Sequence, residues 1–221
     1  MESIRKFHNS VKRNLIQSVT FKGQYVLDVG CGCGGDIQKW NKCGAILFAC
    51  DPSNESLKEA SSRANTMKIP VQFYEGDILS SPDRVFDIIC YNFSLHYIFN
   101  SRDLFFKSIN AIRRRLRPGC KLIGVIPDSQ SILMSTPFND DFGNVFVRSA
   151  ATGNGAFGEK VFVNLADTPY YKGEARPEPI AYKDLLITHL EELGIYLESW
   201  KPIVGEYEIS GLYSSFIFVC K

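Results

Sequence analysis

The chain lacks any stretch that would place it in a membrane. Its apolar runs fall short of the roughly 20 consecutive residues that a membrane-spanning helix requires. The start of the chain is polar and basic with no apolar segment behind it, so we expect a soluble protein without a secretory signal. Internal repeats and low-complexity segments are absent too. With 221 residues, 45% of them hydrophobic, the sequence predicts one domain over residues 1–221 with an ample core.

The seven cysteines lack the spacing of a metal site. Cys31-Gly32-Cys33 is not a C-x₂-C pair, and no second cysteine or histidine pair completes a zinc site, so we predict no bound metal. Their number is odd, and most of them lie in or beside apolar segments. This usage is typical of free thiols in a reducing compartment, and we expect a cytoplasmic protein.

The chain also has no strong excess of charge, since its formal net charge is +1. The charge is nevertheless uneven. The run 113–117 (Arg-Arg-Arg-Leu-Arg) is explained by a solvated helix end, which the helix dipole favours. A second basic cluster lies near the N-terminus and comprises Arg5, Lys6, Lys12, Arg13 and Lys22. A phosphate-binding role for either cluster needs support from elsewhere in the chain.

Hydrophobic periodicity predicts strands that alternate with helices, and therefore an α/β, doubly wound parallel sheet. The predicted strands cover 25–29, 45–50, 71–74, 85–91, 121–126, 195–200 and 212–220. The predicted helices cover 3–18, 36–42, about 51–65, about 101–116 and 180–192. An insertion over about 127–179 interrupts the plan, and within it 142–147 and 160–164 indicate a hairpin.

The glycine loop after the first strand carries the clearest signal. Gly30, Gly32 and Gly35 match G-x-G-x-x-G, which by itself is shared with nicotinamide and flavin enzymes. Asp28 discriminates among them, because a carboxylate there repels a pyrophosphate but can face the cationic end of S-adenosylmethionine. The loop therefore predicts S-adenosylmethionine as the cofactor.

Two further acids follow the next two strands. Asp51 can accept hydrogen bonds from both ribose hydroxyls, and it can equally cap the following helix. Asp77 can hold the adenine amino group, and its position after Asp28 and Asp51 favours this role over that of a turn aspartate. Together with the glycine loop, these acids resemble the class I methyltransferases. That resemblance implies a Rossmann-like, mostly parallel seven-stranded sheet with an antiparallel last strand.

The segment after the fourth strand is a candidate acceptor site. His96 supplies a ring that both donates and accepts, and Tyr97 supplies an aromatic plane, which together suit a flat heterocycle. A capped turn with a buried tyrosine explains the same residues equally well.

Nearly end to end, the chain resembles the mRNA cap guanine-N7 methyltransferases. The similarity lies in several short motifs, which are Phe7–Lys12 (F-N-N-W-x-K), Val26–Asp36 (V-L-D-x-G-C-G-x-G-G-D), Phe93–Tyr97 (F-x-x-H-Y), Gly124–Ser129 (G-x-x-P-[ND]-S), Phe142–Asn144 (F-G-N), Pro177–Leu186 (P-E-x-x-x-Y-x-x-L-L) and Gly211–Tyr213. The resemblance implies methyl transfer from S-adenosylmethionine to N7 of the guanine cap of capped RNA. Because N7 carries a lone pair and no proton, we expect proximity catalysis without a catalytic acid or base.

The resemblance also implies residue roles. The cofactor residues would be Asn9 and Lys12 at the methionine end, with Asp28, Gly30 and Gly32, then Asp51 at the ribose, and Asp77, Ile78 and Ser94 around adenine. The guanine pocket would be made by His96, Tyr97, Pro127, Glu178 and Tyr213. A carboxylate such as Glu178 can accept from guanine N1–H and N2–H₂ together, although without the family a surface-turn acid would be the better interpretation of it.

Three positions depart from the family pattern, and they predict altered contacts rather than lost activity. Cys33 stands where lysine is frequent, His8 replaces an asparagine, and Ser10 replaces the tryptophan. The compact chain resembles the methyltransferase region of a large-DNA-virus capping enzyme. This implies a host-cytoplasm or virion location and other capping domains or subunits as partners.

Other functions remain open at this stage. One is methylation of a different RNA atom or of a small molecule, although methylation of a ribose hydroxyl would call for a base that the motifs do not supply. Another is a non-catalytic scaffold that binds RNA or a capping partner, which would be free to lose Asp28, Gly32 or Asp51. A nicotinamide enzyme is disfavoured by Asp28.

Overall fold

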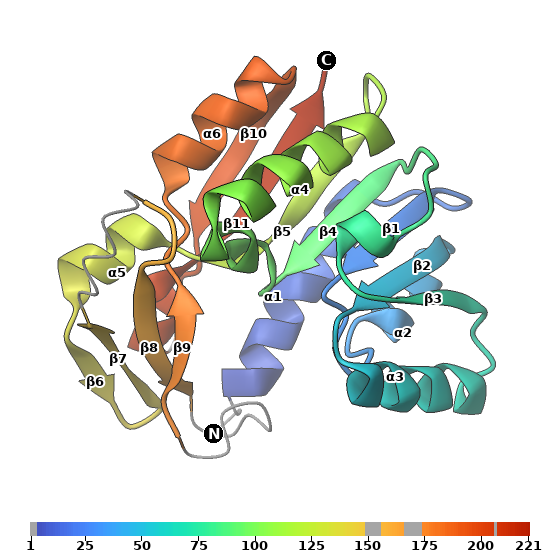
Figure 1. The fold of residues 1–221 in the computed structure, drawn as a ribbon. Coiled ribbons are helices and arrows are strands. Elements are labelled where there is room, and N and C mark those ends of the chain that lie inside the picture. Colours follow the sequence, from blue (N-terminus) through green and yellow to red (C-terminus); the bar gives the residue numbers. More distant parts are fainter. Residues whose placement is uncertain (1–3, 149–155, 166–173, 206) are drawn as a thin grey trace.

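The structure, a computed structural model, describes residues 4–148, 156–165, 174–205 and 207–221. One twisted sheet forms the centre, and helices cover both of its faces (Figure 1). α1, α2 and α3 pack into one hydrophobic cluster, while α4 and α6 pack into a second cluster on the other face. Neighbouring strand residues divide between the two clusters, as Val26 and Leu27 do, because side chains along a strand alternate.

The central sheet has seven strands in the order β10-β11-β5-β4-β1-β2-β3. These are β10 (Ile195–Pro202), β11 (Tyr213–Cys220), β5 (Lys121–Pro127), β4 (Ile88–Asn92), β1 (Tyr25–Val29), β2 (Ile46–Asp51) and β3 (Val71–Glu75). β11 is antiparallel to both neighbours, and every other neighbouring pair is parallel. The predicted α/β fold, with its single antiparallel strand, is confirmed.

The helices follow the predicted alternation, except for one within the predicted insertion that the sequence did not indicate. They are α1 (Ile4–Val19), α2 (Ile37–Lys42), α3 (Asn54–Thr66), α4 (Arg102–Arg115), α5 (Ser129–Ser135) and α6 (Lys183–Glu192), with 3₁₀ helices η1 (Ile78–Ser80), η2 (Leu95–Asn100) and η3 (Glu208–Leu212). Ser53 and Ser101 cap α3 and α4 by accepting from a backbone N–H three residues on, as helix N-caps do. Asp51 is therefore not the cap of α3.

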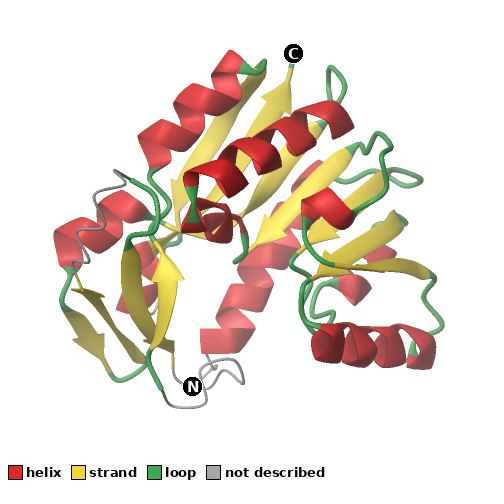
Figure 2. Cartoon of the chain, viewed as in Figure 1, coloured by secondary structure: helices red, strands yellow, loops and turns green. Residues whose placement is uncertain are grey.

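The insertion is larger than the hairpin predicted from the sequence. The predicted strands are present as β7 (Gly143–Arg148) and β8 (Lys160–Leu165), but they form the middle of a four-stranded sheet (Figure 2). β6 (Phe138–Asp140) and β9 (Arg176–Pro179) flank them. β6 is too short to show periodicity, and β9 contains two prolines, which only an edge strand tolerates. The glycine-rich segment 152–158, which would connect the two strands of the predicted hairpin, lies partly outside the described residues.

One strand boundary was wrong. The predicted strand 85–91 is Ile88–Asn92, because the apolar residue Phe86 pairs outside the sheet, its N–H donating to the carbonyl of Arg115 at 2.9 Å. The ladder with β1 and β5 begins only at Ile88.

Within the described ranges the structure contains no membrane-spanning helix, no disulfide and no metal-binding cluster. No helix there is long and apolar enough to cross a membrane. All seven cysteines carry free thiols. No group of three or more histidine, cysteine, aspartate or glutamate side chains in these ranges is arranged to hold a metal ion.

The arginine run at the end of α4 is partly structural. Arg115 is buried, and its guanidinium donates to the carbonyls of Ser81, Pro82 and Ala111 at 2.9–3.2 Å. Arg114, by contrast, is exposed. The sequence did not distinguish these neighbours.

Arg115→Met is expected to lower the free energy of unfolding by roughly 2–4 kcal/mol, because three buried carbonyls lose their donor. Urea denaturation measures this directly. Arg114→Met is the matched control, with an expected change within about 0.5 kcal/mol. Equal effects for the two variants would contradict this account of Arg115.

Candidate functional site

The glycine loop lies at the carboxyl edge of the central sheet and is tied to two neighbouring strands. The N–H groups of Gly30 and Cys31 donate to the carbonyl of Cys50 at 2.8 and 3.1 Å, and Ser94 Oγ donates to the carbonyl of Val29 at 2.5 Å. Gly30 has φ +73°, and a Cβ there would overlap the side chain of Ser94. Only glycine therefore fits at this position.

Asp51 shapes the same loop. Its carboxylate accepts from the N–H of Gly32 at 2.8 Å and from the N–H of Ser53 at 2.9 Å. A Cβ at Gly32 or Gly35 would meet nothing within 4 Å. The loop backbone therefore borders open space, which fits the close approach of a bound nucleotide to bare glycines.

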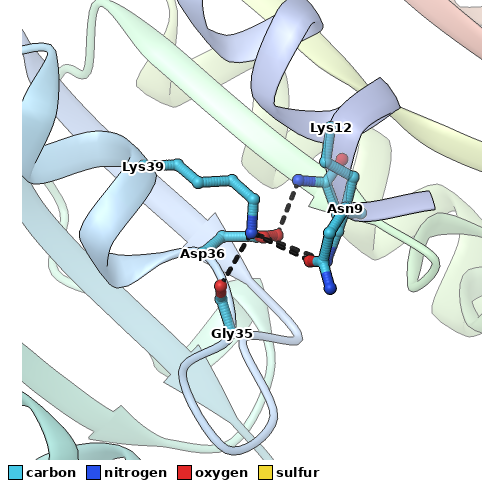
Figure 3. Close-up of polar contacts among 6 residues, drawn as sticks. Asn9, Lys12, Gly35, Asp36 and Lys39 are labelled. Atoms are coloured by element: carbon cyan, nitrogen blue, oxygen red, sulfur yellow. Dashed lines mark hydrogen bonds and ion pairs between the residues drawn. The ribbon is translucent and has the colours of Figure 1, made fainter. Parts of the chain in front are cut away.

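A buried charge cluster joins the loop to the N-terminal helix (Figure 3). One carboxylate oxygen of Asp36 receives the ammonium groups of Lys12 at 2.9 Å and Lys39 at 2.6 Å. Its other oxygen accepts from Asn92 Nδ2 at 2.9 Å. Lys39 also donates to Asn9 Oδ1 at 3.0 Å and to the carbonyl of Gly35 at 2.8 Å. α1, the loop, α2 and the end of β4 are thereby fixed to one another.

The pKa values of the two buried carboxyls nearby, Asp28 and Asp36, are shifted in opposite directions. Burial, then the nearby charge of Asp36, raises the pKa of Asp28. Burial alone would also raise the pKa of Asp36, but Lys12 and Lys39 outweigh it and bring that pKa to about 2. Asp28 is thus a carboxyl whose ionised form the protein alone does not fully compensate, whereas Asp36 is compensated internally.

Asp77 and Ile78 occupy the next loop along the edge. Asp77 Oδ1 accepts from the N–H of Leu79 at 2.8 Å and caps η1, which is the turn role considered from the sequence. Ile78 is almost completely buried. Asp77 is only partly buried, so its position leaves it able to meet a ligand as well.

The predicted acceptor residues His96 and Glu178 come from elements far apart in the sequence and lie next to each other. Nε2 of His96, in η2, lies 3.3 Å from Oε2 of Glu178, in β9, and both side chains are buried. The Tyr97 ring packs on His96 with 4.2 Å between ring centroids. Neither ring nitrogen of His96 makes a hydrogen bond of normal geometry with the described part of the protein. A buried donor–acceptor ring beside a carboxylate is suited to binding a polar heterocycle.

Pro127 and Tyr213 are also together, directly opposite each other in the β5–β11 ladder. The Tyr213 ring lies 5.5 Å from that of Phe93 and 5.6 Å from that of His8. His8 Nε2 is 2.9 Å from Ser210 Oγ. The family asparagine is thus replaced here by an imidazole that packs among aromatic rings.

The structure therefore brings the predicted residues into two adjoining groups at one edge. Asp36 and Lys39 belong to the cofactor-side group but were not among the predicted site residues. Asp36 closes the glycine motif, and Lys39 follows it by three residues on α2, which is a signal the sequence offered.

Comparison with known proteins identifies the family. Residues 1–170 match the model of the mRNA (guanine-N(7))-methyltransferase domain. The chain belongs to this family. It is 33% identical to the mRNA cap guanine-N(7) methyltransferase of Saccharomyces cerevisiae over 144 residues, which cover 58% of this chain and 33% of that protein. It is 32% identical to the Caenorhabditis elegans protein of the same name over 229 residues, covering 88% of this chain and 58% of that protein.

The fold is also that of solved methyltransferases. An S-adenosylmethionine-dependent methyltransferase from Clostridium acetobutylicum superposes with a TM-score of 0.67 over 99% of this chain and 92% of its own, at 15% identity. The chain spans only about a third of the length of two of the yeast relatives that it matches, one of which is the Saccharomyces cerevisiae protein.

Asp28→Asn is expected to stabilise the ligand-free domain at alkaline pH. Because the pKa of Asp28 is raised in the folded protein, the folded state favours the protonated carboxyl. The wild type therefore loses stability as the pH rises and this carboxyl ionises. Asparagine cannot ionise, so the gain in stability of the variant over the wild type should be largest at high pH. Thermal unfolding should show the variant a few degrees higher at pH 8 and little changed at pH 4. A Tm below that of the wild type at pH 8 would contradict the assignment.

His8 should make the domain acid-sensitive. Burial, followed by the charge of Lys12, lowers the pKa of His8 to about 4. The neutral imidazole of His8 contributes fully to the free energy of unfolding above its ordinary pKa near 6.5. This contribution, at most about 3 kcal/mol, is lost as the pH falls toward 4. Denaturant unfolding from pH 7 to pH 4 should show a shallower loss for His8→Asn than for the wild type. Parallel curves would exclude this role for His8.

Proposed function

We propose that this domain transfers a methyl group from S-adenosylmethionine to N7 of the guanine cap of capped mRNA. The observation that carries the proposal is the buried His96–Glu178 pair beside the glycine loop, in a chain of this family. Sequence, site geometry and family membership all favour the same chemistry.

The loop residues fit the cofactor. The backbone at Gly32 and Gly35 leaves room for the nucleoside, and Asp51 is oriented by two backbone N–H groups beside the ribose position. Asp28 supplies the carboxyl that a cationic ligand would keep ionised. Lys12 and Asn9, through Asp36 and Lys39, hold the loop at the methionine end.

Glu178 provides the specific contact to guanine. A carboxylate accepts two hydrogen bonds side by side, which matches the N1–H and N2–H₂ edge of guanine and mismatches adenine. β9 places Glu178 in register with Val161 of β8, so the inserted sheet fixes its position against His96. Tyr97 offers a ring for the base to pack on.

The reaction needs alignment rather than proton transfer. When bound, S-adenosylmethionine supplies the sulfonium methyl, and the N7 lone pair forms the new bond as the carbon–sulfur bond breaks, leaving the positive charge on guanine. Glu178 and its neighbours orient the base and stabilise that developing charge. Well-oriented reactants can gain about 7–11 kcal/mol in this way.

The decisive experiment is methyl transfer from labelled S-adenosylmethionine to GpppA-capped RNA, with identification of the methylated atom. N7-methylguanine is the expected product. A label on ribose or on another base would favour a different RNA methyltransferase. Binding of S-adenosylhomocysteine without any transfer would favour a scaffold.

Glu178→Ala should lower kcat/KM for GpppA-capped RNA by about a hundredfold, because two charge-assisted hydrogen bonds are lost. Glu178→Gln should also lower kcat/KM, because the amide N–H₂ of glutamine would face a hydrogen-bond donor of guanine and could not accept from it. S-adenosylhomocysteine affinity by calorimetry should stay unchanged, and Glu191→Gln, exposed on α6, is the control. Wild-type kinetics in Glu178→Ala would overturn the guanine assignment.

We also propose that the domain works beside other capping activities. N7 methylation acts on a guanine cap that is already in place, so another domain or a partner subunit would have to form that cap. Its cytoplasmic location and its viral source stay predictions from the sequence.

A further inference from the structure

The outer surface of α1 and α2 has charge of one sign. Residues 3–50 contain seven lysines and arginines but only two acids, Asp28 and Asp36. Both acids are buried, with 3% and 6% of their surface exposed, so neither offsets the exposed charge. In a chain whose formal net charge is only +1, this segment is distinctly basic.

The exposed members are Arg5, Lys6 and Arg13 on α1, Lys22 in the loop after it, and Lys42 at the end of α2. Arg5, Arg13 and Lys42 make no ion pair with a residue in the described part of the chain. Burial is the main cause that lowers the pKa of Lys39, and the nearby charges of Lys12 and, to a smaller extent, Arg13 act in the same direction. The exposed cations Arg5, Arg13 and Lys42 thus have no acidic partner in the described part of the protein and lie near other positive charges. An anion bound from outside would therefore be attracted to this surface.

This surface adjoins the acceptor group. α1 presents Lys12 to the charge cluster and His8 to the Tyr213 ring, and Arg5 is one turn before His8. In Figure 1 α1 runs away from the carboxyl edge of the sheet, and its last residue, Val19, precedes the first strand by a short loop. From Arg5 to Arg13 the helix advances about 12 Å, enough to follow two or so phosphates of a single strand.

We propose that the α1–α2 surface, defined by Arg5, Arg13 and Lys42, binds the phosphate backbone of the RNA that follows the cap. This inference rests on the proposed function, since it places the 5′ strand beside the guanine pocket. Arginine suits the role because its planar guanidinium binds phosphate oxygens in pairs. Such contacts carry no sequence information, so the surface serves any capped transcript.

The test compares two double variants. Arg5→Gln/Arg13→Gln removes charge from the α1–α2 surface, and Arg114→Gln/Arg117→Gln is the matched control. Arg114 and Arg117 are equally exposed but lie at the end of α4, just before β5, which is the opposite edge of the sheet. Each protein is assayed with a GpppA dinucleotide and with a capped RNA of about 20 nucleotides.

For the α1 variant we expect KM for the capped RNA to rise at least about fivefold at low salt, with kcat and the GpppA dinucleotide kinetics unchanged. The slope of log affinity against log salt should fall by about 1.4, because single strands release about 0.7 counterion per contact. The control should match the wild type. If KM and slope are unchanged in the α1 variant, the proposal fails, and an acidic protein becomes the better occupant.

Failure of the proposed function gives a different result. If wild-type protein does not methylate the GpppA dinucleotide at N7, that function is wrong, whatever the variants do. Fluorescence anisotropy with labelled capped RNA then still measures the surface alone. Weaker, less salt-dependent binding by the α1 variant supports the surface, and equal binding by both variants overturns it.

Discussion

The carboxylate of Asp36 is the interaction on which the site depends. It is buried, yet two ammonium groups and an amide satisfy it, so the desolvation that would otherwise destabilise it is offset. Each partner comes from a different element: α1, α2 and the end of β4. Without this centre, the polar attachment of the N-terminal helix to the glycine loop would be reduced to the hydrogen bonds of Lys39 with Asn9 and with the carbonyl of Gly35.

The buried polar groups of the site fall into two kinds: those whose hydrogen bonds and charges are satisfied within the protein, and those for which they are not. Asp36 and Asp51 have their oxygens occupied by internal donors and build the frame, as does Asp128, which accepts from Trp200 Nε1 at 2.6 Å and from Ser214 Oγ at 2.7 Å. Asp28 and His96 are buried without equivalent compensation, and both belong to the groups of residues proposed to bind ligands. A protein retains such groups at a stability cost where a ligand completes them, which is why they mark function better than the satisfied ones do.

The order of strands and helices, the glycine loop and the position of the candidate site residues at one edge of the sheet could be predicted because they depend on local periodicity and short motifs. The four-stranded inserted sheet could not, since β6 has three residues and β9 reads as a proline-rich turn. Nor could the pairing of His8 with Ser210, which are 202 positions apart. Contacts at that separation are determined by the complete fold and leave no mark on neighbouring residues.

The His8–Ser210 contact has a consequence for how the protein is made. α1 is synthesised before the rest of this domain, but Ser210 and Tyr213, which His8 contacts, lie in the last dozen of the 221 residues. At about 5–20 residues per second, the first helix waits roughly ten to forty seconds for its docking surface. During that interval His8 lacks both of these partners.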